Sequence, residues 1–277
     1  MVKNNLIAGV MGNPISHSKS PLLFRYWLDK LSIEGQYVPL SVVKQDVEQV
    51  LKTLPKIGFS GLNVTIPHKE LVLKFAEIVT PRAKTIGAAN TLTFLPSGGF
   101  KADNTDGFGF LANLKEHQQN WSSKKCTPLV LGAGGASRSV ISSLLEEGVP
   151  LIYVTNRTFE RAQELRNFFG PQIEVIEWNY KKEILSDIDL LINTTSLGMV
   201  GQKLLDLSLE NIDQNTIVVD LVYNPIKTQL LKEAEKRGCK CVDGLGMLLH
   251  QAIPGFEGWF GKKPIVDTAT RKMFLTK

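Results

Sequence analysis

An apolar run leads into a glycine-rich turn at Val130-Leu131-Gly132-Ala133-Gly134-Gly135-Ala136-Ser137-Arg138. A strand, a turn of this kind and a helix together form the unit that binds the pyrophosphate of a dinucleotide. Glycine lets the backbone approach the ligand, and the helix N-terminus offers free N–H groups and the positive end of its dipole. Ser137 stands where such turns usually carry a third glycine. We therefore expect a dinucleotide to bind at Gly132, Ala133, Gly134, Gly135 and Ala136.

The next predicted strand, at residues 151–155, indicates which dinucleotide this is. An NAD enzyme usually places Asp or Glu at the end of this strand, where it holds the ribose 2′-hydroxyl. This chain has Asn156, Arg157 and Thr158 there, with Arg161 one helical turn later. Two guanidinium groups and a hydroxyl would bind a 2′-phosphate, which a carboxylate would repel. The pattern favours NADP(H) as the cofactor.

The glycine turn begins only at residue 132 of 277, so the sequence before it must form a separate domain. In that part, predicted strands at 6–10, 36–40 and 62–66 alternate with helices near 22–31 and 46–54. A hairpin is predicted with arms at 90–94 and 100–103. This alternation predicts an α/β sheet with parallel strands.

From residue 107 onward the pattern predicts a helix at 107–117 and then a doubly wound sheet. Its strands are expected at 129–131, 151–155, 173–177, 190–193 and 217–221. After residue 246 the chain is helical, and these helices are expected to pack back on the first domain. The predicted fold class is therefore α/β with two domains. Residues 1–105 plus 244–277 would bind the substrate, and residues 106–243 would form a Rossmann-type NADP domain.

Composition excludes several classes of protein. Lys and Arg number 32 against 27 Asp and Glu, but they are scattered, so no nucleic-acid surface is expected. No apolar run approaches the roughly 20 residues that span a bilayer, and the first residues lack a signal-peptide core. The three cysteines lack metal-site spacing, so no metal is expected. We expect a cytoplasmic protein, monomeric or homodimeric, that acts on a small molecule.

Three polar segments of the first domain lie at predicted strand ends or in loops, where doubly wound sheets place ligands. They are Gly12–Pro21, Asn63–Lys69 and Asp103–Gly107. Two of them have a simpler structural explanation in part, because Ser20 is in place to cap a helix and the third segment suits an Asx turn. These explanations do not account for the other polar residues of the segments.

The three segments, together with Gly87–Thr91, Gly132–Arg138, Asn156–Thr158 and Asp243–Gln251, resemble the ordered motifs of the shikimate dehydrogenase family. The resemblance extends along nearly the whole chain. It implies a substrate domain and an NADP domain that face each other across a cleft. It also implies reversible NADPH-dependent reduction of 3-dehydroshikimate to shikimate, in the pathway to chorismate and the aromatic amino acids.

Carried over by position, the resemblance makes Lys69 and Asp106 the catalytic pair. A hydride that leaves or reaches a hydroxyl carbon requires a proton to move at the neighbouring oxygen. Lys69 could be the general acid and base, or mainly a hydrogen-bond donor to the reacting oxygen while Asp106 shares the proton. His68 is expected to support the site from behind or to lie on the surface.

The remaining roles also follow from the resemblance. Ser18, Ser20 and Tyr223 would hold the substrate carboxylate, and Thr65, Asn90, Asp106 and Gln251 the ring hydroxyls. Thr195, Leu221 and Gly244 would lie near the cofactor. Met247 suits either the cleft or the core. The glycines at 107, 109, 244 and 246 suit either a hinge or close packing.

Three other functions share part of this pattern. A quinate/shikimate dehydrogenase would have broader substrate use and sometimes NAD, which Arg157 disfavours. A non-catalytic NADP sensor would not need both Lys69 and Asp106. A folate-linked dehydrogenase would share only the glycine turn.

Overall fold

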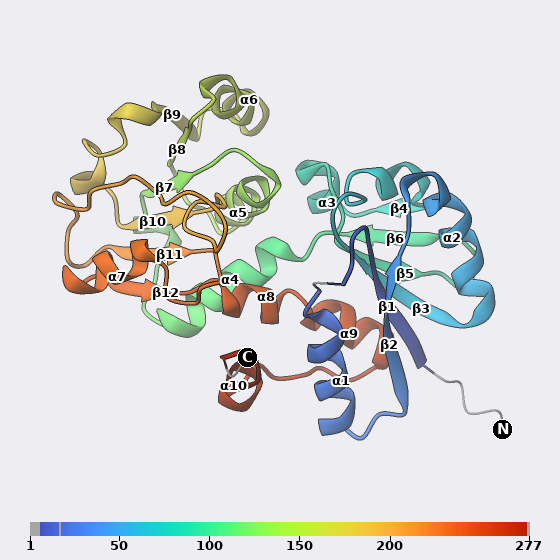
Figure 1. Cartoon of the computed structure of the whole chain (residues 1–277). Helices are drawn as coiled ribbons and strands as arrows, with labels where there is room; N and C mark the ends of the chain where they lie inside the picture. Colours follow the sequence, from blue (N-terminus) through green and yellow to red (C-terminus); the bar gives the residue numbers. More distant parts are fainter. Residues whose placement is uncertain (1–5, 17, 276–277) are drawn as a thin grey trace. The chain divides into compact units, whose positions relative to one another are not determined.

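The computed structural model describes residues 6–16 and 18–275. The chain divides into two compact units, each with its own sheet (Figure 1). The first unit comprises Met1–Asp106 and Leu249–Lys277, and the second comprises Gly107–Leu248. No helix in the described part of the chain combines the length and the apolar character that crossing a membrane requires.

The first unit contains a six-stranded sheet in the order β2-β1-β3-β5-β6-β4. Its strands are β1 (Leu6–Gly12), β2 (Gly35–Ser41), β3 (Phe59–Val64), β4 (Ile78–Val79), β5 (Thr91–Phe94) and β6 (Phe100–Asp103). Strand β1 runs parallel to β2 and β3, as predicted. The hairpin β5–β6 also joins this sheet, with β5 antiparallel to β3. The sheet is therefore mixed, because the tight turn at 95–99 reverses the chain beside β3.

Helices cover both faces of this sheet. The helices of the unit are α1 (Ser20–Lys30), α2 (Val47–Thr53), α3 (Pro81–Ile86), α9 (Ile253–Phe260) and α10 (Thr268–Leu275), with 3-10 turns η1 (Lys44–Asp46), η2 (Leu54–Ile57) and η3 (Leu71–Phe75). Successive side chains of β3 point to opposite faces of the sheet, and both faces are covered. Leu62 packs in a cluster with Leu51 of α2. Gly61 faces Trp259 of α9, and a Cβ at Gly61 would lie 2.0 Å from the indole nitrogen.

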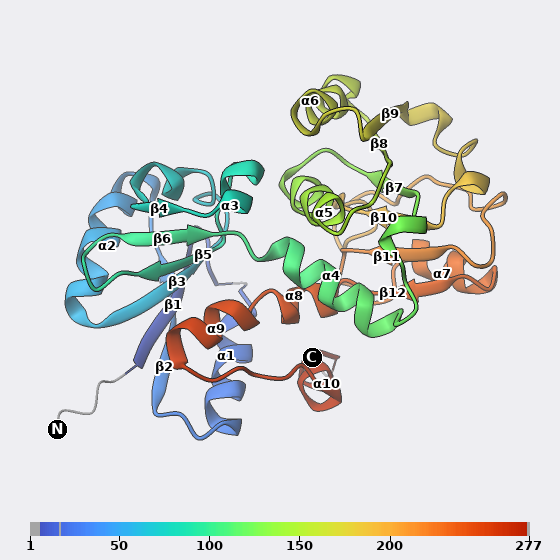
Figure 2. The same cartoon turned by 180° about the vertical axis from the view of Figure 1, so that it is seen from behind.

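Helix α9 confirms that the end of the chain packs back on the first sheet. Phe256 lies against Phe24 of α1, with ring centroids 5.5 Å apart, and Phe24 stacks on Tyr37 at 3.8 Å. The Trp259 indole donates to the carbonyl of Leu92 in β5 at 3.1 Å. The two views of the molecule show α1 and α9 side by side below β1 (Figures 1 and 2). The first unit is thus assembled from both ends of the sequence.

The second unit is a doubly wound parallel sheet, as predicted, and its strands lie in the order β12-β11-β10-β7-β8-β9. Its strands are β7 (Pro128–Leu131), β8 (Ile152–Asn156), β9 (Ile173–Glu177), β10 (Leu190–Asn193), β11 (Ile217–Asp220) and β12 (Lys240–Val242). Its helices are α4 (Asp106–His117), α5 (Gly135–Glu146), α6 (Phe159–Phe169), α7 (Gln229–Lys236) and α8 (Leu245–His250), with 3-10 turns η4 (Ser123–Lys125), η5 (Trp178–Tyr180) and η6 (Leu185–Asp187).

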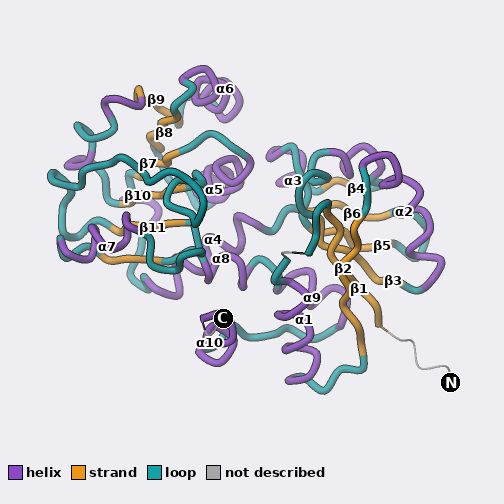
Figure 3. The backbone as a smooth tube through the Cα atoms, in the orientation of Figure 1, coloured by secondary structure: helices purple, strands orange, loops and turns teal. Residues whose placement is uncertain are grey.

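The core of the second unit explains the strong sequence signal of its strands. Alternate residues of β7 enter different clusters, since Val130 packs with α5 and α6 whereas Leu129 and Leu131 pack with α7. Figure 3 shows helices on either side of these strands. Strand β12 was not predicted, because three residues beginning with an exposed lysine carry too little periodicity. The strand order reverses between β7 and β10, which is where such sheets bind ligands.

Candidate active site

One edge of the first sheet brings together the segments that follow β3 and β6 and the start of β5. Strand β3 runs into residues 65–69, and the antiparallel β5 begins beside its end, with Asn63 opposite Thr91. Strand β6 ends at the same edge, with Asp103 opposite Thr91, and leads into residues 104–106. The sequence prediction extended the third strand to Ile66. The strand ends at Val64 instead, because the chain turns at Thr65, whose carbonyl accepts the N–H of His68 at 3.0 Å.

Lys69 and Asp106 form an ion pair at this edge. The Lys69 Nζ lies 2.9 Å from Asp106 Oδ2, and the side chains are 32% and 17% exposed. Asp106 is the first residue of α4, and its N–H is accepted by Asn104 Oδ1 at 3.0 Å. The expected Asx-type contact therefore exists, but Asn104 supplies it, so the Asp106 carboxylate remains directed at the lysine.

Asn90 connects this pair to the C-terminal part of the unit. Its Nδ2 donates to Asp106 Oδ1 at 2.8 Å and to Gln251 Oε1 at 3.1 Å. Its Oδ1 accepts from the Thr105 N–H at 2.9 Å and from the Thr91 hydroxyl at 2.9 Å. Because both ends of the amide are bonded, its orientation is fixed. The geometry brings together Lys69, Asp106, Asn90 and Gln251, four of the residues expected at the site.

Two buried residues, Asn63 from the second predicted polar segment and Tyr37, which the sequence prediction missed, extend the network toward α1. The Tyr37 hydroxyl donates to Asn63 Oδ1 at 2.7 Å, and Asn63 Nδ2 donates to the Asn90 carbonyl at 3.1 Å. Burial raises the pKa of Tyr37 well above its usual value, and a hydrogen bond with Ser20 opposes that rise. Tyr37 and Asn63 lie inside strands, where a polar residue can be placed only once the strand pairing is known.

Ser18, Ser20 and Thr65 lie half-buried in the first unit. Ser18 Oγ accepts the Ser20 N–H at 3.3 Å. The N-cap position of α1 is Lys19, which makes no side-chain capping bond, so Ser20 is not the helix cap. The Thr65 N–H donates to the carbonyl of Met11 in β1 at 2.9 Å. These contacts place hydroxyl groups near the ends of β1 and β3.

His68 is fully buried, so the expectation of a surface position is wrong. Its Nε2 lies 2.7 Å from the carbonyl oxygen of Val42, in the loop after β2. Within the described part of the chain its Nδ1 has no hydrogen-bond partner. The contact with Val42 ties the segment that carries Lys69 to the loop after β2. His68 therefore supports the site and does not line it.

In the second unit, the glycine turn has one glycine that packing requires and two that face open space. Gly132 has φ +111°, and a Cβ there would lie 2.7 Å from Thr194 Oγ1. A Cβ at Gly134 or Gly135 would meet nothing within 4 Å. Since nothing in the fold requires glycine at those two positions for space, the open surface beside the start of α5 suits a phosphate group. Ala133 and Ala136 flank this surface and are half-buried.

Ser137 stabilises the turn in place of the third glycine. Its Oγ accepts the Gly134 N–H at 3.1 Å and lies 2.6 Å from Thr194 Oγ1. The Thr194 hydroxyl donates to the Leu131 carbonyl at 2.7 Å, so Ser137 donates to Thr194 in this chain of bonds. The hydroxyl fits because it links the turn to the loop after β10.

The residues expected to read the 2′-phosphate follow β8 directly. Arg157, Thr158 and Arg161 are exposed at the end of the strand and in the first turn of α6. Asn156 Nδ2 donates to the Thr158 carbonyl at 2.8 Å, which fixes the turn between strand and helix. Two guanidinium groups thus stand at the corner where a ribose-binding carboxylate would otherwise lie.

Thr195, Leu221, Tyr223 and Gly244 also belong to the second unit. The Thr195 hydroxyl donates to Asn193 Oδ1 at 2.7 Å, and Tyr223 is 41% exposed. A Cβ at Gly244 would lie 2.3 Å from the Leu221 carbonyl oxygen, which supports the packing role considered for this glycine. Met247 packs against the core of the unit. Ser18 and Ser20 lie in the other unit, so their shared role with Tyr223 stays a prediction.

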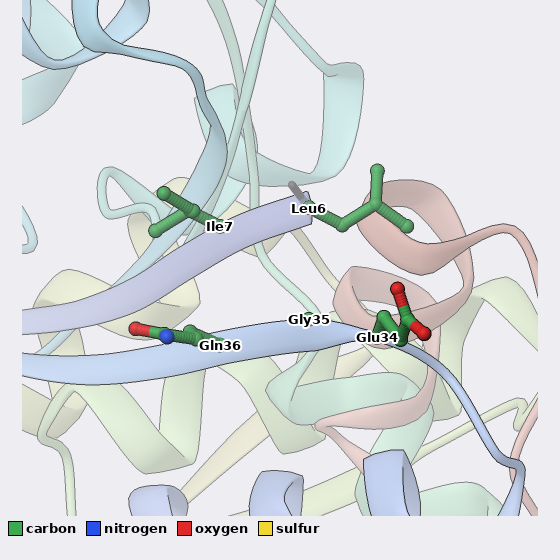
Figure 4. A pocket seen from close by; sticks show the side chains of 5 residues that line it. All are labelled: Leu6, Ile7, Glu34, Gly35 and Gln36. Atoms are coloured by element: carbon green, nitrogen blue, oxygen red, sulfur yellow. The ribbon is translucent and has the colours of Figure 1, made fainter. Parts of the chain in front are cut away.

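A hollow of about 300 Å³ lies at the other end of the first sheet (Figure 4). Its lining consists of Leu6, Ile7, Glu34, Gly35 and Gln36. These residues begin β1 and β2, whereas the polar segments follow the ends of strands. The hollow is therefore separate from the candidate site.

A lysine held by a carboxylate on one unit and an open phosphate-binding turn on the other are the parts of a nucleotide-dependent oxidoreductase. Known proteins identify the class more narrowly. Residues 10–92 match the shikimate dehydrogenase substrate binding domain, and residues 113–236 match the shikimate / quinate 5-dehydrogenase family. Shikimate dehydrogenase (NADP(+)) of Roseobacter denitrificans is 56% identical over 269 residues, which are 97% of each chain.

Solved structures with a similar fold belong to the same class of dehydrogenases. Shikimate 5-dehydrogenase of Thermus thermophilus, in complex with NADP(H) and shikimate, has a TM-score of 0.84 and 34% identity over 97% of each chain. Quinate dehydrogenase of Corynebacterium glutamicum in complex with NAD has a TM-score of 0.90 and 27% identity over 99% of each chain. The chain belongs to the shikimate dehydrogenase family. The predicted family, the fold class and the class of NADP-dependent oxidoreductase are confirmed. Because the match includes residues 10–92, it extends well beyond the glycine turn shared with folate-linked dehydrogenases.

Proposed function

We propose that this protein catalyses the reversible reduction of 3-dehydroshikimate to shikimate with NADPH, on the pathway to chorismate and the aromatic amino acids. In this proposal the first unit binds the substrate and the second binds the cofactor. The observation that carries it is the cluster in which Lys69, Asp106, Asn90 and Gln251 share hydrogen bonds at one sheet edge. We place the enzyme in the cytoplasm, as a monomer or homodimer.

The second unit would bind NADP through the glycine turn, the residues after β8 and three residues near the nicotinamide. Residues 132–136 would take the pyrophosphate on backbone N–H groups, and Asn156, Arg157, Thr158 and Arg161 would surround the 2′-phosphate. Thr195, Leu221 and Gly244 would lie near the nicotinamide. Bound NADPH supplies the hydride that the reaction needs.

The first unit would donate and accept the proton of the reaction. When the carbonyl carbon of 3-dehydroshikimate gains a hydride, its oxygen must gain a proton to become the hydroxyl of shikimate. Lys69 Nζ is the donor in this proposal, and Asp106 Oδ2, at 2.9 Å, holds the ammonium group in place. In the reverse direction the lysine accepts the proton.

The remaining polar groups suit a polyhydroxylated acid. Ser18 and Ser20, with Tyr223, would bind the carboxylate, while Thr65, Asn90, Asp106 and Gln251 would bind ring hydroxyls. A site that matches hydroxyls one by one rejects analogues in which a hydroxyl is missing or displaced, because its own polar groups are then left unpaired.

The test is a set of initial rates with shikimate and quinate, each with NADP and NAD. We expect the highest kcat/KM for shikimate with NADP. The structural similarity to an NAD-bound quinate dehydrogenase makes broad substrate use the second candidate. Comparable kcat/KM for quinate, or for NAD, would favour it. No turnover with any of the four pairs, despite NADP binding, would instead indicate a sensor.

A further inference from the structure

Two buried polar side chains end neighbouring strands of the second unit. Asn193 is the last residue of β10 and Asp220 the last of β11, and the two are paired in register. Both are fully buried. Residues paired in register project their side chains to the same side of a sheet, and here Asn193 Nδ2 donates to Asp220 Oδ1 at 2.9 Å.

Asn193 organises the loop that follows β10. Its Oδ1 accepts the N–H and the hydroxyl of Thr195 at 3.1 and 2.7 Å. Its Nδ2 also donates to the Leu197 carbonyl at 3.2 Å. One amide therefore fixes both the start and the middle of residues 194–198, and every polar atom of that amide is bonded.

Asp220 organises the loop that follows β11. Its Oδ1 also accepts the Val222 N–H at 3.0 Å, and its Oδ2 accepts the hydroxyl of Thr228 at 2.6 Å. Thr228 is the cap of α7, where its hydroxyl accepts the Leu231 N–H. All the groups that bond to this carboxylate are neutral, and burial raises its pKa above the usual value.

A buried carboxylate bonded only to neutral donors is an expensive arrangement. Its geometric advantage is that its two oxygens accept from three donors, the Asn193 amide, the Val222 N–H and the Thr228 hydroxyl. An amide has only one oxygen and cannot accept all three. The arrangement connects residues 194–198, residues 221–223 and the start of α7. These are the segments that contain Thr195, Leu221 and Tyr223.

We propose that Asn193 and Asp220 are positioning residues for the nicotinamide half of NADP. They touch neither substrate nor cofactor; they fix the two loops that flank the nicotinamide in the function proposed above, on which this inference rests. The glycine turn and Arg157 hold the other half of the cofactor. Damage to the pair should therefore weaken only the contacts made by the nicotinamide half.

The test compares two ligands on the variant Asn193→Asp. The substitution keeps the shape of the side chain but replaces Nδ2, which donates to both Asp220 and the Leu197 carbonyl, by an oxygen. A proton shared by the two carboxyl groups can serve only one of these acceptors, so the loop after β10 loses at least one anchor. Adenosine 2′,5′-bisphosphate carries the 2′-phosphate and lacks the nicotinamide. We expect the Kd for NADP to rise about tenfold to a hundredfold, the scale of a disrupted buried polar contact. The Kd for the bisphosphate should stay within about twofold of the original value.

The matched control is Thr216→Val. Thr216 is buried beside the start of β11, and its hydroxyl donates to the Ile188 carbonyl at 3.1 Å, at the opposite end of the strand from Asp220. The control removes a buried hydrogen bond of the same unit and should leave the Kd values of both ligands unchanged. Asn193→Ser removes the amide without adding charge, and it serves as the second variant if Asn193→Asp does not fold.

The inference is overturned if the folded variant binds NADP as tightly as the original protein. It is also overturned if the variant loses both ligands in parallel, because that would indicate general damage to the unit. Failure of the proposed function would look different, since the unchanged protein would then bind no NADP or would not oxidise shikimate.

Discussion

Replacing Lys69 with alanine removes the proposed proton donor while leaving the rest of the network in place. Asp106 would keep its bond from Asn90 at 2.8 Å, and Asn90 would keep its bond to Gln251 at 3.1 Å. The ion pair itself is partly exposed, with 32% of the lysine side chain accessible, so its loss should cost no more than about 1 kcal/mol of folding stability. The substitution should therefore lower the rate of the chemical step and leave folding stability nearly unchanged.

Loss of a positioned acid/base group lowers rates by about 10² to 10⁴. We expect kcat for shikimate oxidation with NADP to fall by a factor in that range, whereas the KM for shikimate changes much less, because other hydroxyl-binding groups remain. Lys74→Ala, at an exposed lysine of η3, is the matched control and should behave like the original protein.

Asp106→Asn tests whether the pair acts as one unit. The amide can no longer hold the ammonium group by charge, so kcat should fall here too. The double variant with Lys69→Ala should be scarcely slower than the worse single variant, because each change disables the same step. A normal kcat with a raised shikimate KM in Lys69→Ala would refute the proton role and leave Lys69 as a binding residue. Additive losses in the double variant would refute the coupling.

Other predictions follow from the charges and the free space around particular residues. Arg157→Asp should shift the cofactor preference in kcat/KM from NADP toward NAD, since a carboxylate repels the 2′-phosphate; an unchanged ratio would contradict the assignment. Gly134→Ala should weaken NADP binding and leave the Tm unaltered, whereas Gly244→Ala should lower the Tm, because its Cβ would collide with backbone at 2.3 Å. Burial alone would raise the pKa of Asp103, but hydrogen bonds and charge from Arg82 outweigh it and lower the pKa. Stability from this carboxylate is thus complete above its unfolded pKa, near 4, and is lost as the pH falls through the lower folded value. Arg82→Ala should therefore reduce the loss of unfolding free energy between about pH 5 and pH 2. An equal loss in the variant and the original protein would contradict the role of Arg82 in lowering the pKa of Asp103.

The sequence was sufficient to predict the relative placement of residues that are close along the chain. The glycine turn and Arg157 are separated by one strand and one helix, so their relation follows from the local pattern. Lys69 and Asp106 were paired by resemblance, and their 2.9 Å contact depends on the hairpin between them. That hairpin was predicted, although its place in the first sheet was not.

Residues whose role depends on strand pairing could not be predicted. Tyr37 looks like an ordinary strand position, and the partners of Asn63 are unknown, until β3 lies between β1 and β5. Asn193 is only the last residue of a strand predicted at 190–193, because its partner Asp220 is 27 residues away. Polar side chains inside strands carry no signal of their own, since their partners are set by register and not by spacing.

The aromatic cluster formed by Phe24, Tyr37, Phe256 and Trp259 also bears on the order in which a growing chain can fold. Synthesis from the N-terminus delivers the whole first sheet early, but Trp259, which covers Gly61, emerges only after the second unit is complete. Gln251, which Asn90 bonds, arrives equally late. We therefore expect the second unit to complete its fold before the first, the reverse of the usual N-terminal-first order. The middle of the chain can mature on the ribosome while the first sheet keeps an uncovered face and an unfinished network until its last helices arrive.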